Sequence, residues 1–115
     1  MKHVLVVGSG LSGLTCAIRL AENGISATLV SPYTSERAQS VMAAGGINAA
    51  IGADDSTGQH AEDTLNSGGN IAGKAAVAGL CSTAPEIIRW LEQLGVVFSR
   101  TETGEVALRA FGGQS

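Results

Sequence analysis

The chain opens with two apolar runs on either side of a helical apolar stripe. His3–Val7 is a short apolar run rich in β-branched residues, which is typical of a parallel strand covered on both faces. Over Leu11–Asn23 the apolar residues recur at helical spacing, and Gly24 stands where a helix end favours positive φ. Ala27–Val30 is a second apolar run, followed by a proline that cannot donate to a sheet. Residues 1–32 are therefore predicted to form one βαβ unit.

The segment 33–58 shows no clean period. It mixes Ser, Gly, Ala and Asn with apolar residues, a composition that favours a long functional loop. One helical turn is expected near Val41.

Residues 59–95 carry helical patterns. Short helices are expected over Gln59–Asn66 and Gly73–Ser82, separated by a glycine-rich breaker. The run Thr-Ala-Pro-Glu that begins at Thr83 has the form of a capping box with proline in the first turn. A third helix should therefore begin there and end before Gly95.

The last segment, residues 96–115, is predicted to hold a β-hairpin and a closing loop. The runs Val96–Phe98 and Glu105–Leu108 flank the turn-forming residues Thr101–Gly104. The predicted fold class is α/β, with a Rossmann-like βαβ unit followed by helices and a β-hairpin. The domain is expected to be an incomplete doubly wound one, because such a sheet needs more strands than these.

Composition narrows the class of protein. Apolar residues make up 44% of the chain, aromatic residues only 3%, and there are 16 glycines, which suits nucleotide-binding loops better than a dense aromatic core. The seven Lys and Arg residues form no cluster and the net charge is −3, so nucleic acid is not expected as a partner. Cys16 and Cys81 fit neither a CxxC pair nor an iron–sulfur spacing, and are predicted to be buried, reduced thiols of a cytoplasmic protein.

Neither a secretory signal nor a membrane span is visible in the sequence. The longest apolar-rich stretch, Val41–Ala53, is interrupted by glycines and is shorter than the roughly 20 residues that a span needs. Membrane contact is therefore expected only through another chain.

The strongest motif lies between the first predicted strand and the first predicted helix. Positions 8–13, Gly-Ser-Gly-Leu-Ser-Gly, match the GxGxxG pattern of dinucleotide-binding loops. Gly8 would make the tight turn, Gly10 would leave room for a pyrophosphate, and Gly13 would let the helix pack closely on the strand. Free N–H groups at the helix N-terminus would bind the pyrophosphate. A simple glycine-rich packing turn is the alternative, and the βαβ context favours dinucleotide binding.

The acidic residue that usually binds the adenosine ribose is missing after the second strand. Ser31 stands there instead and is predicted to be the ribose-side contact. Glu36 follows in the loop and is expected to be a solvated surface charge.

The segment Arg37–Ile51, with its AxGGxxAA core, resembles the flavin-binding segment of the fumarate reductase and succinate dehydrogenase flavoprotein family. Further matches follow in the order that the family shows, ending with Arg-Ala-Phe-Gly-Gly-Gln-Ser at 109–115. The resemblance covers the whole chain. It implies FAD as the cofactor and a parent enzyme that moves a hydride between the flavin and fumarate or succinate. This segment would supply the cofactor cradle and would be inactive alone.

The resemblance also implies which residues lie at the cofactor. Phe111 would pack near the substrate, and no catalytic residue or metal ligand is expected, because the family's proton-donating and carboxylate-binding residues come from later regions. His3 and His60 are expected to be a strand-start residue and part of an exposed helix face. The predicted FAD contacts are Gly8, Ser9, Gly10, Leu11, Ser12, Gly13, Val30, Ser31, Pro32, Ala38, Gln39, Ser40, Ala44, Gly45 and Gly46.

Gln39 bears on how FAD is held. Family members with covalent FAD attach it through a histidine directly before a Ser or Thr in this loop, and here Gln39 precedes Ser40. The resemblance thus implies non-covalent FAD and favours fumarate reduction over succinate oxidation. It also implies a dicarboxylate substrate, and an iron–sulfur subunit with a membrane anchor at the cytoplasmic face as partners. An L-aspartate oxidase-like flavoenzyme and a nucleotide-binding chain without turnover are the alternatives.

Overall fold

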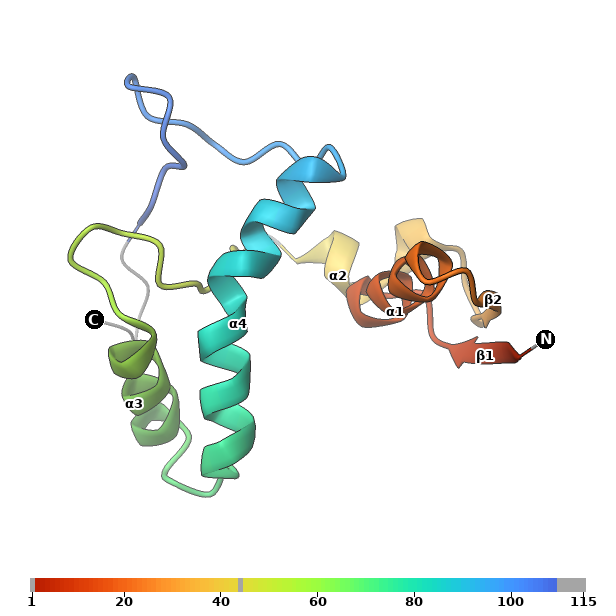
Figure 1. Ribbon diagram of the computed structural model, residues 1–115, viewed down its shortest axis with the longest axis horizontal. Helices are drawn as coiled ribbons and strands as arrows, with labels where there is room; N and C mark the ends of the chain where they lie inside the picture. Colours follow the sequence, from red (N-terminus) through yellow and green to blue (C-terminus); the bar gives the residue numbers. More distant parts are fainter. Residues whose placement is uncertain (1, 44, 110–115) are drawn as a thin grey trace. The chain divides into compact units, whose positions relative to one another are not determined.

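The computed structural model describes residues 2–43 and 45–109. The chain divides into two compact units, Met1–Gly46 and Ile47–Ser115, each of which is described by itself. The elements in chain order are β1 His3–Val7, α1 Leu11–Glu22, β2 Ser26–Val30, the 3-10 helix η1 Ser35–Arg37, α2 Gln39–Met42, α3 Thr57–Ser67 and α4 Lys74–Gln93 (Figure 1).

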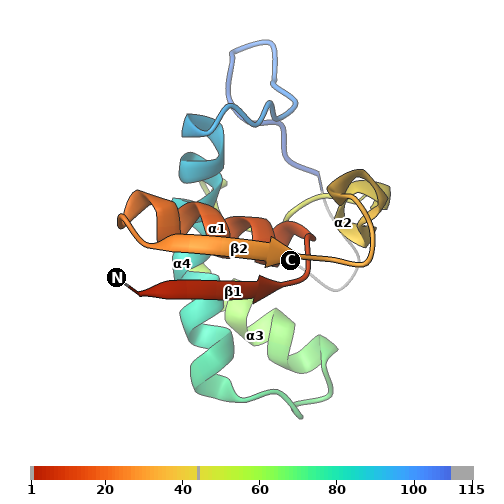
Figure 2. The same ribbon diagram turned by 90° about the vertical axis from the view of Figure 1, so that its right-hand side faces the viewer.

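The first unit contains the predicted strand–helix–strand order. β1 and β2 pair in parallel, from His3 opposite Ser26 to Val7 opposite Val30 (Figure 2). The helix between them ends as expected, because Gly24 adopts a φ of +68° and its N–H donates to the Ala21 carbonyl at 2.9 Å. The βαβ prediction for residues 1–32 is therefore confirmed in its order and its parallel pairing.

The two faces of this sheet differ. Strand alternation places Val6, which is buried, on the face toward α1, where a Cβ on Gly13 would lie 3.6 Å from Val6 Cγ1. The opposite face carries Leu5 and Val7, whose exposed fractions are 62% and 79%. The described residues thus cover one face of the sheet, whereas the sequence pattern predicted cover on both.

The second unit is built on the packing of α3 against α4 (Figure 1). Ser56 caps α3, because its side chain accepts a hydrogen bond from the Gln59 N–H at 3.0 Å. The buried residues of the two helices are His60 from α3 and Val77, Cys81, Ile88, Trp90 and Leu91 from α4.

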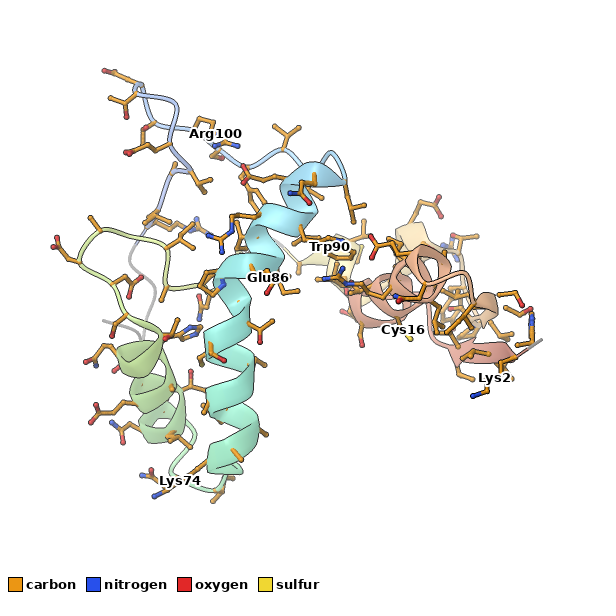
Figure 3. All side chains as sticks on the ribbon, in the orientation of Figure 1. Lys2, Cys16, Lys74, Glu86, Trp90 and Arg100 are labelled. Atoms are coloured by element: carbon orange, nitrogen blue, oxygen red, sulfur yellow. The ribbon has the colours of Figure 1, made fainter. Side chains whose placement is uncertain are left out.

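Two sequence predictions about burial are corrected by the structure. His60 is buried, not exposed, because α3 packs on α4, the next helix in the chain. Cys16 is exposed on α1 (Figure 3), whereas Cys81 is fully buried as predicted. Both thiols are free.

The predicted break at Thr83 is wrong, because α4 runs unbroken from Lys74 to Gln93 with Pro85 inside it. Instead of capping a new helix, the Thr83 hydroxyl donates to the Gly79 carbonyl at 2.8 Å. Proline removes one helical hydrogen bond, the one to the carbonyl of Cys81. Residues buried before and after the proline, Cys81 and Ile88 among them, lie at helical spacing, and their packing favours one continuous helix.

The end of α4 and the turn after it lie where the sequence placed them, but the hairpin strands do not form. Gly95, with a φ of +95°, follows the helix, and Arg100, in the loop beyond (Figure 3), pairs with Val106 in one antiparallel bridge around the turn. Arg100 also forms an ion pair with Glu92 of α4. Val97 is 93% exposed, and an isolated pair of such short runs is too small to be stable as a hairpin by itself.

Within the described part of the chain, no helix combines the length and the apolar character needed to cross a membrane.

Replacing Pro85 by alanine should stabilise the full-length protein by about 1 to 3 kcal/mol, because the restored N–H can donate to the Cys81 carbonyl. The urea midpoint of unfolding measures the change. Glu86→Ala, at an exposed neighbouring position, is the control and should leave the midpoint nearly unchanged. A lower midpoint for Pro85→Ala would show that the proline is required by its packing.

Candidate dinucleotide-binding site

The glycine loop between β1 and α1 begins with a strained turn. Gly8 has a φ of +114°, which a residue with a side chain rarely adopts. Its N–H donates to the Val30 carbonyl at 2.8 Å, so the parallel pairing continues one step beyond the strands. Gly8 therefore closes the sheet and turns the chain toward α1, the role predicted for it.

Gly13 marks a very close approach of α1 to the end of β1. A Cβ on Gly13 would lie 1.9 Å from the Gly8 carbonyl oxygen and 2.9 Å from the Gly8 carbonyl carbon. Both partners are backbone atoms, which cannot move aside as a flexible side chain can. A glycine is required at this position by packing alone.

The N-terminus of α1 keeps free hydrogen-bond donors. Gly10 is the N-cap residue and offers no side chain, so no side chain of the cap satisfies the first turn. The Leu11 N–H donates to the Ser40 hydroxyl at 3.0 Å. Among the described residues, the N–H groups of Ser12 and Gly13 form no hydrogen bond. Unpaired amides at a helix N-terminus, with the helix dipole behind them, are donors of the kind that bind anions.

A pair of serines joins the glycine loop to the end of β2. Ser9 is buried, and its hydroxyl donates to Ser31 Oγ at 2.8 Å, with the Tyr33 carbonyl oxygen at 3.4 Å. The residues on either side, Val30 and Pro32, are exposed. Ser31 thus lies beside the loop, at the carboxyl end of the sheet, where the sequence placed the ribose contact.

The predicted flavin segment lies partly within reach of this loop. Ala38 is the N-cap of α2, and Gln39 and Ser40 are its first two residues. Gly45 and Gly46 are exposed, and a Cβ on either would meet nothing within 4 Å. Their neighbours therefore leave open space beside this backbone. Ala44 and Phe111 lie outside the described residues.

Glu36 takes no part in this site. It is exposed, as predicted, and hydrogen bonding to its own backbone N–H and to the Thr34 hydroxyl lowers the pKa of its carboxyl group. Nor do the described residues bring together three side chains of the kind that bind metal ions.

The donors around the loop match the chemistry of a dinucleotide. Free amides of the first helical turn suit a pyrophosphate, the Ser31 hydroxyl suits a ribose, and the open backbone at Gly45 and Gly46 suits a flat ring. Sequence reasoning assigned Ser9 to FAD and did not find its bond to Ser31, nor the contact between Ser40 and Leu11. Small hydroxyl residues inside and after the GxGxxG run were the available signal.

Comparison with known proteins shows which family the chain belongs to. A family model described as an FAD binding domain matches residues 3–115. The chain is 42% identical over 115 residues to the succinate dehydrogenase flavoprotein subunit of Bacillus subtilis, covering 97% of this chain and 20% of that protein.

Two solved structures have the same fold as this chain. They are the apo Sdh1 complex of Mycobacterium smegmatis, with a TM-score of 0.92, and quinol fumarate reductase of E. coli, with a TM-score of 0.91, each at 30% identity. The matches cover 100% and 99% of this chain and 20% of each matched chain. The chain therefore spans about a fifth of the length of the relatives that it matches.

Gly13→Ala should strongly destabilise the full-length protein, by about 3 kcal/mol or more, because its Cβ would overlap the Gly8 carbonyl. Thermal unfolding of the flavin-free protein isolates this effect from cofactor binding. Gly45→Ala is the matched control, since its Cβ meets open space, and its melting temperature should stay within about 2 °C of the parent value. Equal melting temperatures for Gly13→Ala and the parent would contradict the close approach.

Proposed function

Since the chain belongs to the family of FAD-binding domains and is similar to flavoprotein subunits of succinate dehydrogenase, we propose that it forms the cofactor cradle of an oxidoreductase interconverting fumarate and succinate. FAD is its cofactor. The single observation that supports the cradle best is the N-terminus of α1, where Gly13 packs against Gly8 and the N–H groups of Ser12 and Gly13 stay free among the described residues.

In this proposal each part of the first unit holds one part of FAD. The N–H groups of Ser12 and Gly13 bind the pyrophosphate, and the Ser31 hydroxyl binds the adenosine ribose. The backbone from Gln39 to Gly46 lies along the ribityl chain and the isoalloxazine. Bound FAD supplies the hydride chemistry, while these residues orient the cofactor and supply hydrogen bonds to it.

We further propose that FAD is held without a covalent bond and that the parent enzyme works mainly as a fumarate reductase. The support for the first point is Gln39, whose carboxamide is no nucleophile for the flavin, at the position before Ser40. The direction of the reaction follows from the non-covalent binding, because the family resemblance associates non-covalent FAD with fumarate reduction. A partner iron–sulfur subunit, with a membrane anchor at the cytoplasmic face, completes the proposal.

Substrate assays on the parent enzyme test the activity. Fumarate-dependent oxidation of a reduced dye is the expected result. Peroxide formation that depends on aspartate, with no response to fumarate, would indicate an aspartate oxidase instead. A protein that binds FAD and turns over neither substrate would be a binding module.

Gly10→Val should lower the flavin content of the purified parent enzyme at least tenfold, because the side chain would occupy the pyrophosphate position and press on Ser40 Oγ, 3.3 Å from the Cβ position. The ratio of flavin absorbance to protein absorbance measures it. Gly79→Val makes the same chemical change on α4, where the added Cβ meets nothing within 4 Å, and should keep the flavin. A folded Gly10→Val enzyme with full flavin content would contradict the proposed cradle.

Acid denaturation should release all the FAD into the supernatant, because Gln39 offers no covalent link. The precipitate and the supernatant are compared by flavin fluorescence. In a Gln39→His variant, part of the flavin should stay with the precipitate, which would place this residue against the isoalloxazine. Yellow precipitate from the unchanged protein is the outcome that contradicts non-covalent binding.

A further inference from the structure

One hydrogen bond joins the two segments of the first unit that the proposed function assigns to the pyrophosphate and to the flavin side of FAD. The Leu11 N–H, in the first turn of α1, donates to Ser40 Oγ of α2 at 3.0 Å. The two residues are 29 positions apart. Ser40 Oγ also lies 3.3 Å from the place where a Cβ on Gly10 would be. The hydroxyl therefore stands directly at the glycine loop.

The short helix α2 has little else to hold it in place. It is four residues long, too short to be stable by its own hydrogen bonds. Its apolar side chains Val41 and Met42 are 61% and 71% exposed, so burial contributes little. Across the described residues, the bond from Ser40 to Leu11 is the one hydrogen bond between α2 and any residue outside 34–43.

The Ser40 hydroxyl also retains a proton to donate. A serine hydroxyl has one proton and two lone pairs, and Leu11 N–H uses one lone pair. No described residue accepts the proton of Ser40. The hydroxyl can therefore hold the Leu11 amide and donate to an anion at the α1 N-terminus at the same time.

We propose that Ser40 is a positioning residue that couples the pyrophosphate loop to the flavin segment. By fixing α2 to the first turn of α1, it sets the position of Gln39 and of the rest of α2 relative to the glycine loop. The flavin segment is thus aligned before the cofactor arrives. This proposal rests on the proposed FAD cradle for its ligand, and on the described hydrogen bond for its geometry.

Amide hydrogen exchange on the full-length, flavin-free protein tests the coupling. In Ser40→Ala, exchange should become about fivefold faster at Leu11 and across residues 39–43 together, as the loss of one hydrogen bond predicts. Ser40→Thr keeps the hydroxyl and should restore the parent rates. Ser35→Ala is the matched control, because the Ser35 side chain makes no hydrogen bond among the described residues.

The cofactor provides a second readout. The Kd for FAD should rise about fivefold to tenfold in Ser40→Ala, and the flavin absorption band should shift. In Ser40→Thr the Kd should equal that of the parent protein. Faster exchange at Leu11 alone would show a plain helix cap and overturn the coupling, as would unchanged exchange over residues 39–43. A parent protein that binds no FAD would defeat the proposed function, whereas the flavin-free exchange rates would still decide whether Ser40 joins the two segments.

Discussion

The first unit depends on the contact between the backbone of α1 and the end of β1. Gly13 sits so close to the Gly8 carbonyl that any side chain would overlap it, and Gly8 is held in turn by its bond to Val30 on β2. This contact fixes where the helix begins and which way its first amides point. Backbone packing therefore orients these amides without the help of a charged side chain.

Around that rigid contact the recognising groups are small and neutral. Hydroxyls of Ser9, Ser31 and Ser40 surround the loop, where many dinucleotide sites carry an acidic residue for the ribose. A hydroxyl can donate or accept, so it suits both a phosphate oxygen and a ribose. Under the proposed function these hydroxyls would bind the ligand through directed hydrogen bonds, and the dipole of α1 would add an attraction that salt screens.

The sequence correctly predicted those elements that depend on the spacing of nearby residues. β1, α1 and the stop at Gly24 follow from spacing and from one residue's φ, and the GxGxxG run located the close contact. Long-range packing decided the rest. His60 is buried by a helix that begins beyond the next loop, and α4 passes through Pro85 because the apolar stripe continues on both sides of it. The bond between Ser40 and Leu11 depends on the path of a loop, which no periodicity encodes.

The paired segments of the first unit are close together in the sequence, and this affects how fast they can form. β1 pairs with β2 at a separation of 23 residues, and the bond from Leu11 to Ser40 spans 29. Chains with such local contacts order faster than chains that must close long loops. A ribosome makes 46 residues in roughly 2 to 10 s, far longer than a helix or a short loop takes to form. All the segments that contact one another in the first unit are therefore synthesised before the residues of α3 and α4.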